Sequence, residues 1–295
     1  MSVASDIQSP VALILCGGGS RGALEVGFYR ALHEIGLPVD LIIGSSIGAL
    51  NGAFIAGGMP PADLAALWRG FRRQDGIRWN LRWLLDPRRR PGLFTLDPLR
   101  DLLRHTLPAT RFEHLAVPLS IVTTDLQSGK AVYWADNGDI IEPLVASLSL
   151  PGLFPPVEIG SGQFVDGGIA NNVPLDRAVA LGARDILMIQ CVCCEGRATP
   201  YRGLINILAR SFSIALDCKY ATDRMHFGGH ARIHIVRPRF SLEIGLLDFR
   251  HSADLIHIGY QQSLAYFNQN PLARTAAVPT ASECAPAQTV GMQPE

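Results

Sequence analysis

Charge is scarce in this sequence, and neither sign dominates it. Charged residues make up 18% of the 295 residues, and 26 Lys plus Arg balance 26 Asp plus Glu. The chain therefore lacks the basic excess that is typical of nucleic-acid-binding proteins, and we expect no nucleic-acid partner. Hydrophobic residues, at 48%, supply ample material for a buried core, so the composition predicts a globular protein and excludes overall disorder.

Two further absences concern the N-terminus and the cysteines. The first fifteen residues contain no Lys or Arg and include Asp6 and Pro10, which is not the pattern of a secretory signal. We therefore expect a cytoplasmic protein, with peripheral contact at the inner membrane surface as an option. Paired CxxC modules are also missing, which favours reduced thiols over disulfides or zinc. We thus expect no metal site at the six cysteines, which are Cys16, Cys191, Cys193, Cys194, Cys218 and Cys284.

One uncharged stretch, residues 41–62, is long enough to span a bilayer as a helix. It contains five glycines and Pro60, however, and its first part, LIIGSSIGALNG, is more typical of a strand, a turn and a helix. The membrane span is kept as the minor alternative.

Hydrophobic periodicity predicts an α/β protein. Apolar runs at 12–16 and 41–43 are each followed by glycines and then by a segment with helical spacing, at 22–35 and 46–56, which indicates parallel βαβ winding. We expect further strands at 118–125, 131–134, 163–165, 185–192 and 232–236, and further helices at 61–72, 97–105, 140–147, 204–220 and 251–267. The apolar side of the helix at 204–220 is expected to pack in the core. One domain should cover residues 10–270, with a disordered tail at 275–295.

Residues 44–48, GSSIG, match the pattern G-x-S-x-G between a predicted strand and a predicted helix. The sharp turn that lifts such a serine above a sheet strains its backbone and brings neighbouring turns close, so glycine is needed on both sides. A second match, residues 18–22, also lies between strand and helix. Its successive glycines suit a flexible loop better than a strained turn, which favours Ser46 over Ser20 as a nucleophile.

The glycine loop at 17–22, GGGSRG, has two interpretations. It satisfies G-x-G-x-x-G, so Gly17, Gly19 and Gly22 could bind a dinucleotide pyrophosphate, although the acid expected after the second strand is missing and Asp40 precedes that strand instead. In an acyl-transfer enzyme, its backbone N–H groups would bind a developing oxyanion, with Arg21 either assisting or pairing with a carboxylate.

A serine nucleophile needs a base. Asp166 ends a predicted strand and precedes Gly167 and Gly168, which would let a substrate or another backbone approach. From the residues alone, an aspartate that only stabilises its own turn is an equally good interpretation.

Taken in order, residues 17–22, 44–48 and 166–168 resemble the three signatures of the patatin-like phospholipase family, GGGxRG, GxSxG and DG[AG]. The runs ASLSLPGLFPP at 146–156 and NVP at 172–174 also resemble family sequence. The resemblance implies a three-layer α/β/α sandwich with a mainly parallel central sheet. It also implies hydrolysis of lipid acyl esters, of the phospholipase A or lysophospholipase kind, through an acyl-enzyme and without metal or organic cofactor. The implied site consists of Ser46 as nucleophile, Asp166 as proton acceptor, an oxyanion hole at Gly17, Gly18, Gly19, Ser20, Arg21 and Gly22, and the motif glycines Gly44, Gly48, Gly167 and Gly168.

A Ser-His-Asp esterase is the nearer alternative, because several histidines follow Asp166 in the sequence. None of them lies in a distinguishing motif; they are His226, His230, His234, His251 and His257.

Residues 68–90 hold three of the four tryptophans and eight arginines. This mixture, from Trp68 to Arg90, suits contact with a membrane surface or anionic lipid headgroups. A solvated segment with packed tryptophans is the competing interpretation.

Overall fold

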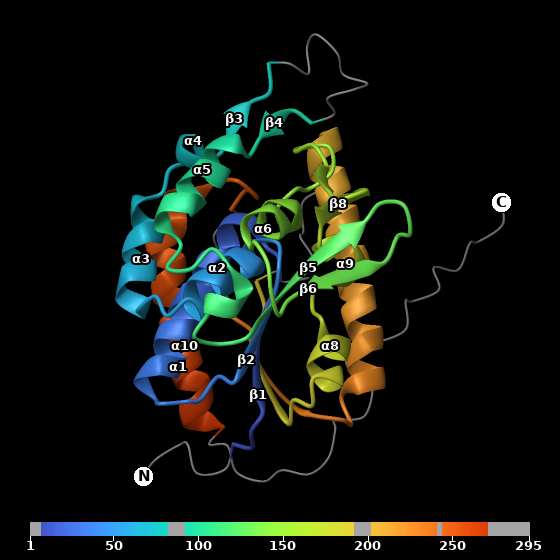
Figure 1. Ribbon diagram of the computed structural model, residues 1–295. Coiled ribbons are helices and arrows are strands. Elements are labelled where there is room, and N and C mark those ends of the chain that lie inside the picture. The colour runs from blue at the N-terminus through green and yellow to red at the C-terminus, as the bar shows by residue number, and fades with distance from the viewer. Residues whose placement is uncertain (1–6, 82–91, 192–201, 241–243, 271–295) are drawn as a thin grey trace, which may run out of the picture.

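The computed structural model describes residues 7–81, 92–191, 202–240 and 244–270, and the predicted tail at 275–295 lies outside them. A central sheet has the strand order β10-β9-β1-β2-β5-β8-β7, and β6 pairs with β5 (Figure 1). Its strands are β1 (Val11–Leu15), β2 (Leu41–Ser45), β5 (Leu119–Asp125), β6 (Ala131–Trp134), β7 (Val157–Ile159), β8 (Gly162–Asp166), β9 (Asp185–Ile189) and β10 (Arg232–Val236). Two short strands, β3 (Arg78–Trp79) and β4 (Phe94–Thr95), form a separate antiparallel pair.

Strands β10, β9, β1, β2 and β5 are parallel, whereas β6, β7 and β8 pair antiparallel. The sequences of β1, β2 and β9 are nearly continuous apolar runs, and every residue in them is buried. Such strands require cover on both faces, which the flanking helices provide.

The helices are α1 (Ala23–Glu34), α2 (Ile47–Ala56), α3 (Pro61–Gly70), α4 (Arg73–Gly76), α5 (Asp97–Thr106), α6 (Ile141–Ser147), α7 (Gly168–Asn171), α8 (Leu175–Ala180), α9 (Leu204–Phe227) and α10 (Ser252–Gln269). Short 3-10 turns lie at Gly19–Gly22, Phe112–His114 and Phe249–His251.

Two apolar clusters fill the spaces on the two faces of the sheet. Alternate residues of β1 belong to different clusters: Leu13 packs with residues of α1, α2 and α10, whereas Ile14 packs with Leu175 and Ala178 of α8. Figure 1 shows α1, α3 and α10 on one side of the sheet and α8 and α9 on the other. The predicted three-layer α/β/α fold with a mainly parallel sheet is confirmed.

The order of pairing along β5 brings two strand ends together. Val122 pairs with Ser45 of β2, and the next residue, Thr123, pairs with Asp166 of β8. Because β6 pairs with both Val122 and Thr123, strands β2 and β8 must share the opposite edge of β5. They run towards each other along that edge, so their C-terminal ends meet.

Residues 41–62 form β2, α2 and the start of α3. The interpretation of this stretch as a strand, a turn and a helix is therefore confirmed. Within the described part of the chain, no helix has the length and apolar character needed to cross a membrane. The prediction that one side of the 204–220 helix packs in the core is wrong at Ile207, which is 48% exposed on α9.

The segment at 68–90 divides into buried and exposed parts. Trp68 is buried, and its indole N–H donates a hydrogen bond to Asn51 Oδ1 at 2.8 Å, so the prediction of membrane contact is wrong for this residue. Trp79 and Leu81 are exposed, and residues 82–90 lie outside the described ranges.

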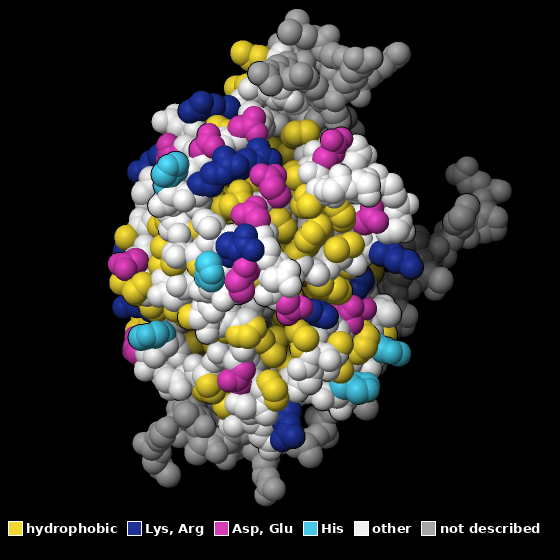
Figure 2. Space-filling model, viewed as in Figure 1, with side chains coloured by type: hydrophobic (Ala, Val, Ile, Leu, Met, Phe, Trp, Pro, Cys, Tyr) yellow, Lys and Arg dark blue, Asp and Glu magenta, His cyan; other side chains and the backbone are white. Residues whose placement is uncertain are grey.

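Acidic and basic side chains lie side by side over α5 on the face shown in Figure 2. Arg100 pairs there with Asp97 and Glu142, and Arg104 pairs with Asp101. This part of the surface is therefore charged without favouring either sign.

Candidate active site

Ser46 occupies a strained turn between β2 and α2. Its backbone has φ 54° and ψ −126°, a conformation that costs a non-glycine residue about 1–3 kcal/mol. A Cβ at Gly44 would lie 2.5 Å from the Cα of Ala49, and a Cβ at Gly48 would lie 2.2 Å from the carbonyl oxygen of Leu15. These approaches explain why the pattern has glycine at both ends.

The turn and the end of β8 bring Ser46 and Asp166 into direct contact. The Ser46 hydroxyl donates a hydrogen bond to Asp166 Oδ2 at 2.6 Å, across 120 positions of sequence. Asp166 is only 5% exposed, whereas Ser46 is half-buried. The other carboxylate oxygen of Asp166 accepts the N–H of Gly168 at 2.8 Å, which fixes the orientation of the carboxyl group.

The surroundings of Asp166 suit a proton acceptor. Burial raises the pKa of Asp166 to about 6, although hydrogen bonds from Ser46 and Gly168 act in the opposite direction. The group is therefore ionised at neutral pH, yet it holds a proton more readily than an exposed aspartate.

Buried hydroxyl groups support both members of this pair. Ser147 Oγ accepts the N–H of Ser46 at 2.9 Å and donates to the carbonyl of Val122 at 2.6 Å. Thr124 Oγ1 donates to the carbonyl of Asp166 at 2.8 Å. Sequence reasoning missed these roles, although Ser147 lies in the run at 146–156 that resembled family sequence.

The glycine loop lies against Ser46, since a Cβ at Gly17 would be 3.0 Å from the Cβ of Ser46. The N–H of Gly17 donates to Asn172 Oδ1 at 2.8 Å, and the N–H of Ser20 donates to the carbonyl of Leu246 at 2.8 Å. These two amides are therefore engaged, which corrects the expectation that the whole loop supplies donors.

The amides of Gly18 and Gly19 form no hydrogen bond with the described residues. They remain the donors of the loop that an oxyanion could use. Asn172, which holds the neighbouring Gly17, was not predicted as a site residue, although the run at 172–174 was noted.

The remaining loop residues, Ser20, Arg21 and Gly22, are packed against neighbouring parts of the chain. Ser20 is 1% exposed, and its hydroxyl donates to the carbonyl of Gly245 at 2.9 Å rather than to a carboxylate. A Cβ at Gly22 would lie 2.7 Å from the side chain of Ile47, so this glycine allows the loop to pack on α2. Arg21 is half-buried, and burial lowers the pKa of its guanidinium.

The late histidines do not complete a triad here. None of them forms a hydrogen bond with Ser46 or Asp166 in the described structure. His234 instead contacts Asp185 at 2.9 Å. Asp185 begins β9, which is parallel to β2, so this pair lies towards the end of the sheet opposite to Ser46.

Comparison with known proteins identifies relatives of the chain. A model of the patatin-like phospholipase family matches residues 13–179. An uncharacterized NTE family protein of Mycobacterium tuberculosis is 36% identical over 220 residues, which cover 72% of this chain and 59% of that protein. Patatin-like phospholipase domain-containing protein 7 of Mus musculus is 32% identical over 182 residues, which cover 61% of this chain and 13% of the relative.

Among solved structures, VipD from Legionella pneumophila matches with a TM-score of 0.48 and 16% identity, over 90% of this chain and 67% of that chain. The chain spans 59% of the mycobacterial relative and a much smaller share of the mouse protein. The family model covers more than half of the 295 residues and includes the glycine loop, Ser46 and Asp166. The chain belongs to the patatin-like phospholipase family.

Proposed function

We propose that the chain is a serine hydrolase of lipid acyl esters, with phospholipids or lysophospholipids as substrates. The observation that carries the proposal is the 2.6 Å hydrogen bond from the hydroxyl of Ser46, on its strained turn, to the buried carboxylate of Asp166. Membership of the patatin-like phospholipase family supports the substrate class.

In the proposed reaction, Ser46 Oγ attacks the ester carbonyl carbon while Asp166 Oδ2 accepts the hydroxyl proton. The carbonyl oxygen becomes an oxyanion, which the N–H groups of Gly18 and Gly19 and the positive end of helix α2 stabilise. As the tetrahedral intermediate collapses, the ester C–O bond breaks and the leaving alcohol takes the proton from Asp166. An acyl-enzyme remains on Ser46.

Deacylation repeats these steps with water. Asp166 accepts a proton from the attacking water, the acyl–Oγ bond breaks, and Ser46 regains its proton as the fatty acid leaves. The carboxylate thus serves both halves of the cycle, and no histidine is required. A pKa of about 6 leaves Asp166 basic enough to accept the proton and ionised at neutral pH.

Two exposed apolar side chains lie within the arginine-rich segment at 68–90. Trp79 is 67% exposed and Leu81 is 71% exposed, so this end of the molecule offers apolar side chains to a lipid surface. We propose that the enzyme is cytoplasmic and reaches its substrate peripherally, at the inner membrane surface, through these residues.

The test is turnover of a soluble aryl ester, together with labelling by a fluorophosphonate. Wild type should be labelled and active, Ser46→Ala should lose both properties, and Ser20→Ala should keep both. Asp166→Asn should lose turnover. Labelling that survives Ser46→Ala but disappears in Ser20→Ala would overturn the assignment, and loss of turnover on replacing His226, His230, His234, His251 or His257 would favour a triad.

Phospholipid and lysophospholipid vesicles then test the substrate class. Release of fatty acid by wild type, and none by Ser46→Ala, is the expected result. Tight binding of NAD without any esterase activity would instead move the protein to the dinucleotide-binding class.

A further inference from the structure

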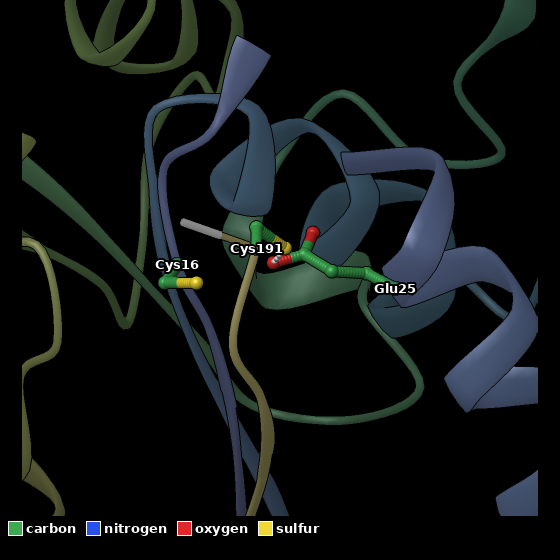
Figure 3. A group of neighbouring side chains, drawn as sticks. All are labelled: Cys16, Glu25 and Cys191. Atoms are coloured by element: carbon green, nitrogen blue, oxygen red, sulfur yellow. Dashed lines mark hydrogen bonds between the residues drawn. The ribbon is translucent and has the colours of Figure 1, made fainter. Parts of the chain in front are cut away.

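Two thiols and a carboxyl group converge beside the glycine loop. Cys16 follows β1, Glu25 lies in the first turn of α1, and Cys191 follows β9, and all three side chains are buried. Their two sulfur atoms and one carboxylate oxygen lie within 4.8 Å of one another. Figure 3 shows the Cys16 thiol and the Glu25 carboxyl group both pointing towards Cys191.

The carboxyl group of Glu25 is in an unusual position for a structural acid. It is 0% exposed, and it forms no salt bridge within the described part of the chain. Its oxygens contact Asn51 Nδ2 at 2.8 Å and the Cys191 sulfur at 3.4 Å. A buried carboxylate without a cation is costly, so a bound cation would offset the burial of this group.

The spacing of the three groups fits one thiophilic cation. Zinc bonds of about 2.3 Å to sulfur and about 2.0 Å to oxygen separate the ligands of a tetrahedral ion by about 3.5–3.8 Å. The distance of 3.4 Å between Cys191 Sγ and Glu25 Oε1 is close to this separation. Cys16 Sγ lies within 4.8 Å of the other two ligand atoms.

Charge balance points the same way. Two thiolates and one carboxylate carry three negative charges, and zinc with the guanidinium of Arg21 would carry three positive charges. Arg21 is close enough to act electrostatically on both thiols, and its Nε is buried without a hydrogen-bond partner in the described structure. We propose that Cys16, Glu25 and Cys191 form a binding site for a thiophilic divalent cation, with Zn²⁺ as the first candidate.

The site would brace the loop that carries the free amides. Cys16 directly precedes Gly17, and a Cβ at Gly18 would lie 2.7 Å from the Cβ of Cys191. A cation bound to all three side chains would tie the start of the loop to α1 and to the end of β9. Binding itself does not depend on the proposed hydrolase activity, so the two proposals can fail separately.

The test uses the full-length reduced chain in which Cys193, Cys194, Cys218 and Cys284 are replaced by serine, so that the two thiols of the site are the only ones. Cd²⁺ serves as a spectroscopic probe, because thiolate ligation produces an ultraviolet charge-transfer band, and Zn²⁺ binding is measured by equilibrium dialysis. We expect one ion per chain, the charge-transfer band, and a higher unfolding temperature with metal.

Single replacements assign the ligands. Cys16→Ser and Cys191→Ser should each weaken binding by at least about tenfold, as should Glu25→Gln, since even loss of an outer partner of a metal costs about 10–100-fold. Glu158→Gln, at an exposed carboxyl group, is the matched control and should bind as the background protein does.

Far-ultraviolet circular dichroism checks that each protein is folded. If a replacement prevents folding, the titration of the background protein still decides the question. Absence of the charge-transfer band in that folded protein, or unchanged binding in folded Cys16→Ser and Cys191→Ser, would overturn the proposal.

Discussion

Replacing Asp166 by asparagine should abolish turnover and at the same time make the folded protein more stable. Burial raises the pKa of Asp166 from 3.8 to about 6. The folded protein therefore holds this proton more tightly than the unfolded chain does, so the ionised carboxylate opposes folding. The cost is nearly absent at low pH, grows as the pH rises from 3.8 to about 6, and is fully present above about pH 7.

The magnitude follows from the difference between the two pKa values of Asp166, 3.8 in the unfolded chain and about 6 in the folded protein. At 1.36 kcal/mol per unit, the ionised group costs about 3 kcal/mol at pH 7.5 and only about 0.5 kcal/mol at pH 4. Asparagine carries no charge, and its side-chain oxygen can still accept the N–H of Gly168. Asp166→Asn should thus gain up to about 3 kcal/mol in the free energy of unfolding at pH 7.5, and about 0.5 kcal/mol at pH 4.

Urea unfolding at the two pH values measures the gain, with Ser46→Ala as the matched control. That variant should also be inactive, but it keeps the carboxylate and loses the hydrogen bond that lowers its pKa, so it should gain no stability at pH 7.5. The reasoning is refuted if Asp166→Asn is no more stable than wild type at pH 7.5, or if its gain is equal at both pH values.

Three further predictions concern the same site. Turnover of a soluble aryl ester should fall about tenfold per unit below about pH 6, because protonated Asp166 cannot accept a proton; a flat pH profile of kcat/KM would contradict its role as base. Gly48→Ala should lose about 1–3 kcal/mol of stability, because its Cβ would meet the carbonyl of Leu15. Gly70→Ala, at the end of α3 with nothing within 4 Å, is the control and should be no less stable than wild type in the same thermal melts. Ser147→Ala should lose about 2 kcal/mol of stability and lower kcat, because it removes the partner of the Ser46 amide and a hydrogen bond to the carbonyl of Val122. Steady-state kinetics with wild-type kcat would show that Ser147 does not position the nucleophile.

The layered fold could be predicted from the sequence because its signals are local. The apolar runs of β1 and β2 and the helical spacing after each of them all lie within residues 11–56. The order of strands in the sheet depends instead on distant pairing. No local pattern indicates that β2 and β8 share one edge of β5, and this pairing is what brings Ser46 to Asp166. Family resemblance supplied the pair where periodicity could not.

Other residues escaped prediction because their roles depend on partners elsewhere in the chain. A tryptophan next to arginines in the sequence can either contact a membrane or pack in the core, and the local sequence does not distinguish the two. Trp68 packs because it donates a hydrogen bond to the buried Asn51, which lies outside the arginine-rich segment. The cysteine spacing predicts no metal site, and the site proposed above could not be inferred from spacing, because a search for zinc motifs compares neighbouring cysteines. Cys16, Glu25 and Cys191 come from three separate elements.

The backbone explains why only one of the two G-x-S-x-G matches forms a strained serine turn. In the match at residues 44–48, the positive φ falls on Ser46 itself, so its side chain projects from the turn towards Asp166. In the match at residues 18–22, the positive φ of 59° falls on Gly19, and Ser20 directs its hydroxyl to the backbone carbonyl of Gly245. Gly19 thus adopts the positive φ that Ser46 adopts in the other turn, and a glycine does so at little energetic cost. In this chain, the glycine directly before Ser20 therefore accompanies a loop in which Ser20 is turned away from Asp166, and the serine directly before Ser46 accompanies the strained turn that presents Ser46 to Asp166.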